Sequence, residues 1–367
     1  MQNIKKYRAF LFLLSGVCTL LHTKTNDIIL GQTAALSGNL GLYGRTIKNG
    51  INAYFEYINN SGGINGKKIY LESLDDKGDP EQAINNIKIL QKKGIDIFIG
   101  CTGVRSIERM LPLIQEKKIA MLFPWAGDEK FRNPQLIFMI NGLGYLKPQL
   151  EAIVTELTQK RKINRIAIFH ADDDFSTQAT QDLMVLLKKE KITPLVTTSY
   201  NRLTVDITQA AQKIIETNPK IVISLGTSMP TVDLINYLWS HGYYGINFIG
   251  IDSTLFVNSI LKSRNTPFTF TSAVPDPTSS QIPLAQEYRK QLDRFAPEES
   301  YNILSFSYFL SAAIIVKAIK ECSDHISKEN VITAIEQFKN TSCDGISLSF
   351  DPSTRHIFGT EISIIKG

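Results

Sequence analysis

The sequence predicts an α/β fold with two lobes, each built on a parallel β-sheet that has helices on both faces. Short apolar runs alternate with longer stretches whose apolar residues recur at helical spacing, and this alternation is typical of parallel sheets. The alternation occurs in two successive runs, before and after residues 145–148. The length of 367 residues also favours two domains over one.

The first run opens with a complete βαβ unit. Residues 28–30 form a short apolar run that suits a buried strand. Gly38, Gly41 and Gly44 then predict a compact loop, because glycine allows another group to approach the backbone closely. An amphipathic helix follows, and residues 69–74 predict the second strand. The loop is expected at the carboxyl end of the first strand, where open α/β sheets bind small ligands.

The remaining elements continue this pattern. Asp79 can cap a helix that has Pro80 at its first position and Gln82 at its third, which predicts a helix up to residue 93. Further helices are expected over residues 107–117, 149–160, 176–189, 206–216, 231–241, 254–262, 281–295, 303–322 and 328–339. Further strands are expected over residues 96–100, 119–123, 138–140, 165–170, 195–199, 221–225, 248–251, 346–350 and 362–365.

Several residues of the first βαβ unit form a combination that is more specific than the glycine pattern alone. They are Ser37-Gly38, Tyr43-Gly44, Asn59, Gly62-Gly63-Ile64-Asn65-Gly66 and the acidic pair Asp75-Asp76. This combination resembles the opening of the type I periplasmic binding proteins, the solute receptors of ABC importers for branched-chain amino acids and related compounds. A Walker phosphate loop is the competing interpretation, but Gly44-Arg45-Thr46 lacks its lysine.

The resemblance covers nearly all of the chain after the first 25 residues, and it implies two Rossmann-like lobes joined by a multi-strand hinge. In this family the C-terminal part recrosses the hinge, so each lobe consists of discontinuous segments. We therefore expect one lobe from residues 26–145 and 275–345, and the other from residues 146–274 and 346–367. The resemblance also implies a small-molecule ligand, an amino acid or an analogue, that both lobes contact when the hinge closes.

In the first lobe, the resemblance implies a ligand contact from Tyr43 and from the loop over residues 101–106. For Tyr43, packing on its own helix is the alternative. The loop follows a strand and precedes a helix, so its free backbone N–H groups can face an anion. Relatives often have Ser or Thr where this chain has Val104, which leaves Thr102 or Ser106 to supply a hydroxyl group. Ser106 alternatively serves only as the cap of its helix.

A further ligand-binding loop contains Trp125 and Gly127. Gly127 lets a backbone N–H approach a carboxylate, and Trp125 offers a large apolar wall, with core packing as the alternative for the indole. The matching positions of the second lobe are Phe175, Ser228 and Asp252. Asp252 matches the acid that accepts the ligand's α-ammonium group in amino-acid receptors of this family. Its alternative role is to cap the helix over residues 254–262.

His170 and the acids Asp172, Asp173 and Asp174 lie at the end of a predicted strand. They resemble a metal cluster by composition. Consecutive acids in a turn cannot all point at one ion, so we interpret them as caps of the next helix. We expect neither a metal nor a cofactor.

Three cysteines remain after the first 25 residues: Cys101, Cys322 and Cys343. Cys322 ends a predicted helix and Cys343 precedes a predicted strand, so a disulfide between them is one interpretation, worth about 3 kcal/mol. The alternative is that all three are buried thiols. Their spacing is not that of a metal site.

The first 25 residues indicate export. Three positive charges precede an apolar run over residues 9–21, which is too short to span a bilayer and predicts a secretory signal over residues 1–25. The alternatives are a buried N-terminal helix and a lipid anchor on Cys18, although Val17 fits a lipoprotein cleavage site poorly. We expect the protein in the periplasm.

The charge of +5 falls close to neutral once these residues are removed, so nothing favours nucleic acid as a partner. Neither a Gly-x-Ser-x-Gly elbow nor a His-Glu-x-x-His helix is present, which argues against a hydrolase. We expect a non-enzymatic, monomeric receptor that delivers its ligand to the membrane permease of an ABC importer. The alternative is a ligand-sensing subunit that signals through a membrane partner, because both functions use hinge closure.

Overall fold

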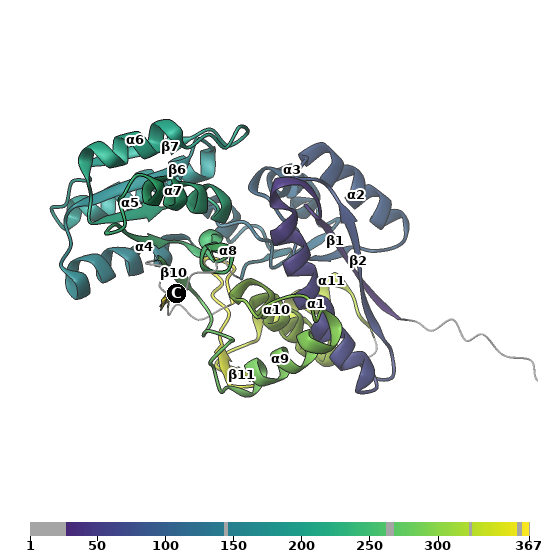
Figure 1. Cartoon of the computed structure of the whole chain (residues 1–367). Helices are drawn as coiled ribbons and strands as arrows, with labels where there is room; N and C mark the ends of the chain where they lie inside the picture. Colours follow the sequence, from purple (N-terminus) through teal and green to yellow (C-terminus); the bar gives the residue numbers. More distant parts are fainter. Residues whose placement is uncertain (1–26, 143–145, 262–267, 323–324, 358–361, 367) are drawn as a thin grey trace, which may run out of the picture.

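The computed structural model describes residues 27–142, 146–261, 268–322, 325–357 and 362–366. The expected signal peptide and Cys18 lie outside these residues. Figure 1 shows two lobes, each with helices packed around its own sheet. The predicted two-lobed α/β fold is therefore confirmed.

The first lobe contains a five-stranded sheet with the order β2-β1-β3-β4-β5, and all of its strand pairs are parallel. The strands are β1 (Ile28–Ala34), β2 (Ile69–Asp75), β3 (Ile97–Ile99), β4 (Ala120–Leu122) and β5 (Met139–Ile140). The helices are α1 (Gly41–Asn60), α2 (Pro80–Lys92), α3 (Val104–Gln115), α9 (Pro283–Phe295), α10 (Ile303–Glu321) and α11 (Lys328–Glu336). Two short 3-10 helices, η1 (Gly38–Leu40) and η2 (Glu129–Arg132), belong to its loops.

The second lobe contains a six-stranded sheet with the order β13-β10-β9-β8-β6-β7, in which only β13 is antiparallel to its neighbour. The strands are β6 (Ile166–Ala171), β7 (Val196–Tyr200), β8 (Ile221–Ser224), β9 (Asn247–Gly250), β10 (Phe268–Ser272) and β13 (Ser363–Lys366). The α-helices are α4 (Leu146–Thr155), α5 (Asp174–Lys189), α6 (Thr208–Thr217), α7 (Ser228–Ser240) and α8 (Val257–Leu261). A short π-helix, η3 (Glu156–Arg161), and a 3-10 helix, η4 (Asp252–Thr254), complete the lobe.

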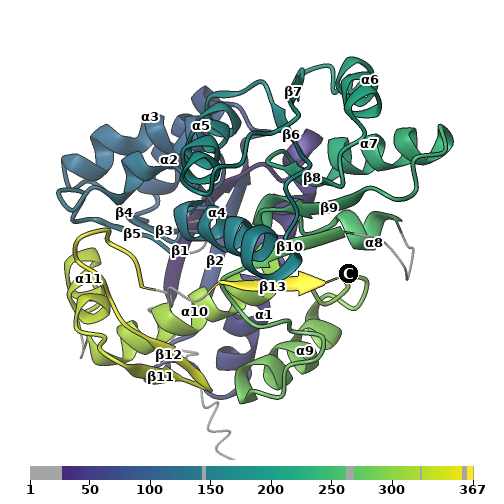
Figure 2. The same ribbon diagram turned by 90° about the vertical axis from the view of Figure 1, so that its left-hand side faces the viewer.

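The end of the chain serves both lobes. β11 (Thr341–Cys343) and β12 (Ile346–Leu348) pair with each other, and Figure 2 shows this hairpin beside α11, whereas β13 lies beside β10. We predicted that the chain passes from the first lobe to the second between residues 345 and 346, and this position lies in the turn of the hairpin. Two segments that connect the lobes run side by side, because Asn141 after β5 forms a parallel bridge with His356 before β13.

Helix α10 forms the centre of the first lobe. It is the one helix among the described residues that is long and apolar enough to cross a membrane, and 89% of that window is buried inside the molecule. It is therefore a core helix. Its contact with α1 requires glycine at position 50, since a Cβ atom there would lie 2.1 Å from the carbonyl oxygen of Ser305.

Two local predictions near the start of helices need correction. The glycine-rich loop is shorter than expected, because α1 already begins at Gly41. Gly44 lies inside α1, where a Cβ atom would come within 2.0 Å of the carbonyl oxygen of Ala35, so it serves close packing of the helix. The helix expected over residues 254–262 is instead η4 followed by the short α8. The cap of α2 is confirmed: the Asp79 carboxylate accepts hydrogen bonds from the first turn.

The proposed disulfide is not formed. Cys101, Cys322 and Cys343 are all free and buried. The Cys322 thiol donates a hydrogen bond to the carbonyl oxygen of Ala318 within its own helix, 3.2 Å away. Burial raises the pKa of the Cys343 thiol to about 12, so it is held in its neutral form. The alternative, three buried thiols, is the arrangement that the structure has.

Candidate functional site

The predicted loop after β3 is fixed by hydrogen bonds of its own. The Thr102 hydroxyl oxygen accepts a hydrogen bond from the N–H of Ala35, at 3.0 Å, and Thr102 is buried. Gly103, with φ of 92°, is the N-cap residue of α3, and no side chain caps this helix. Ser106 lies buried in the first turn and is not the cap, while Val104, the first residue of α3, is half-buried. The hydroxyl of Thr102 is thus already engaged, and the first turn of α3 offers backbone N–H groups.

Trp125 and Gly127 lie next to this loop. The N–H of Trp125 donates to the carbonyl oxygen of Cys101 at 2.8 Å, and its carbonyl oxygen accepts from the N–H of Gly103 at 3.4 Å. The indole of Trp125 is half-buried and stacks on the ring of Tyr43, with 4.8 Å between the ring centroids. Gly127 is buried. The two predicted loops of the first lobe are therefore neighbours, as the parallel order of β3 and β4 requires.

Tyr43 reaches from the first lobe into the second. Its hydroxyl group lies 2.8 Å from the carbonyl oxygen of Ser253, 3.0 Å from the backbone nitrogen of Ser228 and 3.0 Å from the Ser228 Oγ. Its ring also meets the edge of Phe256 at 5.3 Å. Burial raises the pKa of Tyr43 to about 12, although the hydrogen bonds with Ser228 lower it. The phenol therefore stays neutral and joins the two lobes.

Ser228 is the first residue of α7 and is buried. The N-cap residue, Thr227, makes no side-chain cap hydrogen bond, so the hydroxyl of Tyr43 takes that role from the other lobe. The Ser228 Oγ accepts a hydrogen bond from the N–H of Phe256 at 3.2 Å, which ties α7 to the segment after η4. Ser228 thus contacts Tyr43 of the other lobe, and its contact with a ligand stays a prediction.

Asp252 follows β9 and is the first residue of η4. Burial raises the pKa of its carboxyl group to about 6, against the lowering effects of hydrogen bonds from the Gln149 side chain and the Ser253 backbone and of the Arg132 charge. The backbone N–H of Asp252 donates to the Gln149 Oε1 at 2.9 Å. The charge of Asp252 contributes to the raised pKa of Tyr43, and the next residue, Ser253, has its carbonyl oxygen 2.8 Å from the Tyr43 hydroxyl group. The alternative role as the cap of a following helix is wrong, because Asp252 lies inside η4 and α8 begins only at Val257.

Phe175 stands apart from the other predicted site residues. It lies in the first turn of α5, is half-buried and packs against the apolar core of the second lobe. No described contact joins it to Tyr43, Trp125 or Asp252. The residues that the structure brings together are therefore those around Tyr43, from the start of α1, the loop after β4, the start of α7 and η4.

The comparison with protein families decides the identity of the fold. Residues 27–360 match the model of the periplasmic binding protein family. The chain belongs to this family. A Leu/Ile/Val-binding protein homolog from Brucella melitensis is 26% identical over 144 residues, which cover 39% of this chain and 39% of that protein. The chain thus matches about two-fifths of the length of this relative.

Two solved structures show how far the similarity of fold extends. A possible leucine/isoleucine/valine-binding protein from Rhodopirellula baltica has a TM-score of 0.83 at 20% identity, with 93% of this chain and 94% of that chain covered. The branched-chain amino acid transporter substrate binding protein LivJ from Streptococcus pneumoniae, in complex with isoleucine, has a TM-score of 0.77 at 14% identity, with 90% and 93% covered. The family and the type I, Leu/Ile/Val-binding resemblance are thereby confirmed.

Several residues that interact with Asp252 or Tyr43 were not predicted from the sequence. They are Arg132, Gln149, Ser253 and Phe256. Arg132 is buried at the end of η2, although the run Asp128-Glu129-Lys130-Phe131-Arg132 has the composition of an exposed turn. Ser253 contributes through its carbonyl oxygen, which no side-chain pattern can indicate. Only Phe256 could have been predicted as a contact, because it is an apolar residue two positions after the start of a predicted helix.

Of the three acids after β6, Asp173 caps the next helix as predicted, whereas Asp172 does not and Asp174 is already the first residue of α5. The Asp173 carboxylate accepts a hydrogen bond from the N–H of Ser176 at 2.8 Å and caps α5. The Asp172 carboxylate accepts from the N–H of Arg202 at 2.8 Å and so holds the loop after β7. Within the described ranges, no group of three or more His, Cys, Asp or Glu side chains is arranged to hold a metal ion.

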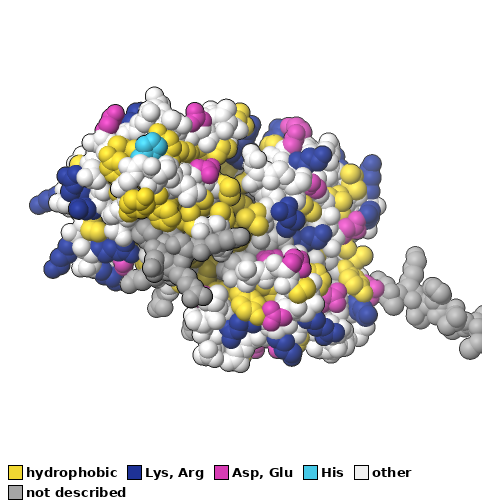
Figure 3. Space-filling view, viewed as in Figure 1, with side chains coloured by type: hydrophobic (Ala, Val, Ile, Leu, Met, Phe, Trp, Pro, Cys, Tyr) yellow, Lys and Arg dark blue, Asp and Glu magenta, His cyan; other side chains and the backbone are white. Residues whose placement is uncertain are grey.

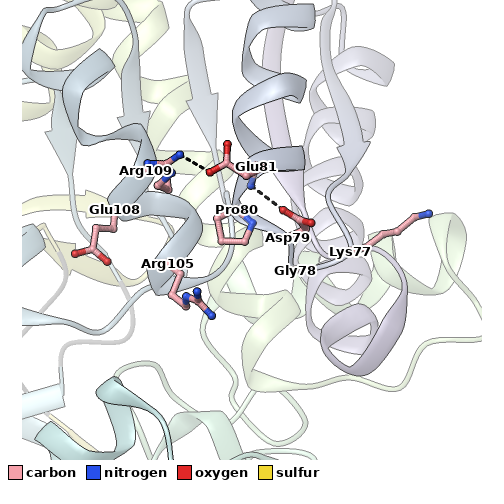
Figure 4. A pocket seen from close by; sticks show the side chains of 8 residues that line it. All are labelled: Lys77, Gly78, Asp79, Pro80, Glu81, Arg105, Glu108 and Arg109. Atoms are coloured by element: carbon pink, nitrogen blue, oxygen red, sulfur yellow. Dashed lines mark hydrogen bonds and ion pairs between the residues drawn. The ribbon is translucent and has the colours of Figure 1, made fainter. Parts of the chain in front are cut away.

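A surface pocket of about 650 Å³ lies outside the cleft, at the starts of α2 and α3. Figure 4 shows Arg105, Glu108 and Arg109 of α3 on one side and Pro80 and Glu81 of α2 on the other. Arg109 forms an ion pair with Glu81. The wall therefore carries mixed charges that partly neutralise one another, and none of the predicted ligand contacts lines it.

The surface near the cleft differs from this charged region. In Figure 3 hydrophobic side chains gather over α7 and α8, whereas the Lys, Arg, Asp and Glu side chains on this face are spread over the rest of the molecule. Met229 beside Ser228 is 51% exposed and belongs to the start of α7. The apolar surface thus continues outward from the contact between the lobes.

Proposed function

We propose that this periplasmic binding protein is the solute receptor of an ABC importer and holds an amino acid or a close analogue between its two lobes. Its family and its similarity to Leu/Ile/Val-binding proteins support this class of ligand. The family also supports a location outside the cytoplasm, where the receptor would deliver its ligand to a membrane permease.

The ligand's carboxylate is assigned to the first lobe. The first turn of α3 has backbone N–H groups and no side-chain cap, and the buried Gly127 adds no side chain of its own beside it. These N–H groups carry the partial positive charge of a helix start, which favours an anion. Thr102 is assigned a positioning role, because its hydroxyl oxygen accepts from Ala35 and fixes the loop.

The ligand's ammonium group is assigned to Asp252, and this residue carries the proposal. Its carboxyl group lies in the second lobe, close to Tyr43 of the first, and burial raises its pKa to about 6. Asp252 is half-buried, and an acid that is costly to ionise alone gains from a bound cation. The charge of Arg132 lies near enough to lower the pKa of Asp252, so the ligand's ammonium group shares this carboxylate with a resident cation.

The magnitudes require contacts from both lobes. Shifting an open–closed equilibrium from 1:99 to 99:1 takes about 5.5 kcal/mol of preference for the closed state. A hydrogen bond with a charged partner contributes about 1.5–3 kcal/mol, so Asp252 alone does not suffice. Apolar burial against the half-buried indole of Trp125 supplies part of the remainder.

Isothermal titration with the twenty standard amino acids tests the proposal. We expect at least one of them to bind the wild-type protein, and Asp252→Asn to weaken that binding by about 10- to 100-fold. The matched control is Asp174→Asn, which removes an exposed acid from the first turn of α5 in the same lobe and should leave the affinity unchanged. Equal affinities of the wild type and Asp252→Asn would remove the ammonium role of Asp252.

A further inference from the structure

The hydroxyl group of Tyr43 joins the first lobe to the second. A phenol has one proton, and of the two acceptors in reach the carbonyl oxygen of Ser253 is the nearer, at 2.8 Å against 3.0 Å for the Ser228 Oγ. The hydroxyl oxygen in turn accepts from the N–H of Ser228 at 3.0 Å. Both hydrogen bonds run from one lobe to the other, and both end on backbone atoms.

The second lobe holds these two backbone groups in place. The Ser253 Oγ donates to the carbonyl oxygen of Gly226 at 2.6 Å, which ties η4 to the loop before α7. The Thr231 Oγ1 donates to the carbonyl oxygen of Thr227 at 2.8 Å in the first turn of α7. The position that receives the Tyr43 hydroxyl is therefore built from the second lobe alone.

The first lobe also fixes the position of the Tyr43 side chain. The ring of Tyr43 stacks on Trp125 with an interplanar angle of 19°, and the residue is 4% exposed. Gly44, the next residue, lets α1 pack directly on the backbone of Ala35. The start of α1 is thus fixed to the sheet, and the hydroxyl group of Tyr43 points at the start of α7.

We propose that Tyr43 is a built-in latch that caps α7 from the opposite lobe and so stabilises the contact between the two lobes. The latch rests on the proposed hinge closure and describes how that closure is regulated. Because the hydroxyl of Tyr43 already accepts from the N–H of Ser228, this first N–H of α7 is not available to an anionic ligand. The ligand's carboxylate is thereby directed to the start of α3, in the first lobe.

Amide hydrogen exchange of the ligand-free, full-length protein tests the latch directly. The first amides of a helix have no acceptor within the helix and normally exchange fast. We expect the amide of Ser228 to exchange about tenfold more slowly in the wild type than in Tyr43→Phe, since the variant loses the hydroxyl that accepts from it. The control is Tyr54→Phe, which removes a hydroxyl from a buried tyrosine of the same helix that lies within the first lobe.

If Tyr43→Phe does not fold, two amides of the wild-type protein can be compared with each other instead. Val104 and Ser228 are each the first residue of their helix, and neither helix has a side-chain cap of its own. With intrinsic rates corrected, the Ser228 amide should be protected about tenfold more than the Val104 amide. Equal protection at the two positions, or the same Ser228 rate in the wild type and Tyr43→Phe, would overturn the latch. Because no ligand is present, either outcome leaves the role of Asp252 to its own titration.

Discussion

The helix starts of α3 and α7, between which we propose that the ligand binds, differ in how their first N–H groups are satisfied. Both α3 and α7 begin directly after a strand loop, at Val104 and Ser228, and neither is capped by its own N-cap residue. The start of α7 receives the hydroxyl group of Tyr43 from the opposite lobe. The start of α3 lies beside Trp125, with its cap residue Gly103 bonded to that residue's carbonyl oxygen.

The difference assigns two roles, closure of the lobes and binding of an anion, to two different helix starts, because one N–H group cannot serve both. A helix start that is satisfied by a protein hydroxyl contributes to closure, since the bond exists only when the lobes meet. A helix start without a side-chain cap keeps its N–H groups and its partial positive charge for an anion. In our account α7 therefore serves closure and α3 serves recognition.

The strongest disruption of this arrangement is expected from Gly44→Ala. Alanine is worth about 1 kcal/mol more than glycine inside a helix, but the new Cβ atom would lie 2.0 Å from the carbonyl oxygen of Ala35. The clash outweighs the gain, so we expect the free energy of unfolding to fall by about 3 kcal/mol in urea denaturation. It should also move Tyr43 away from α7 and abolish the slow exchange of the Ser228 amide.

Gly245→Ala is the matched control for this prediction. A Cβ atom at Gly245 would meet no atom within 4 Å, and its backbone does not require glycine. The stability of Gly245→Ala should stay within about 0.5 kcal/mol of the wild type. If Gly44→Ala were equally harmless, the close contact between α1 and the loop after β1 would not hold Tyr43 in place.

A smaller effect is expected from pH, and it concerns recognition. Asp252 must be ionised to accept a hydrogen bond from an ammonium group, and burial raises its pKa to about 6. Lowering the pH from 7.5 to 5 then protonates about nine-tenths of this carboxyl group, so the affinity for an amino acid should fall about tenfold and level off above pH 7. Titration calorimetry across this range measures the change. Asp252→Asn should show no such slope, and a flat wild-type profile would exclude Asp252 as the ammonium partner.

Much of the fold was predictable because it depends on local periodicity. The βα alternation, the cap at Asp79 and the loops at Trp125 and Asp252 follow from patterns of a few residues. Strand β10 was missed, although Phe and Thr alternate over its first four residues, all five are buried, and prolines at positions 267 and 275 flank it.

The arrangement of the site was harder to predict because it depends on distant parts of the chain. Tyr43 and Ser228 are 185 positions apart, so no local pattern shows that one caps the other. Arg132 is buried in a segment rich in charge, where composition indicates exposure. The expected bridge between Cys322 and Cys343 failed for a similar reason, since spacing gives no information about how two thiols lie in space.

The central claim, that two lobes close on a ligand which touches both, is tested most directly by small-angle X-ray scattering of Tyr43→Phe with each standard amino acid. Without the latch, the empty variant should be more open than the wild type, and the amino acid that binds should reduce its radius of gyration toward the wild-type value. The wild type should contract less on the same addition. Superimposable profiles of Tyr43→Phe with and without every amino acid, including one that binds by calorimetry, would contradict the claim.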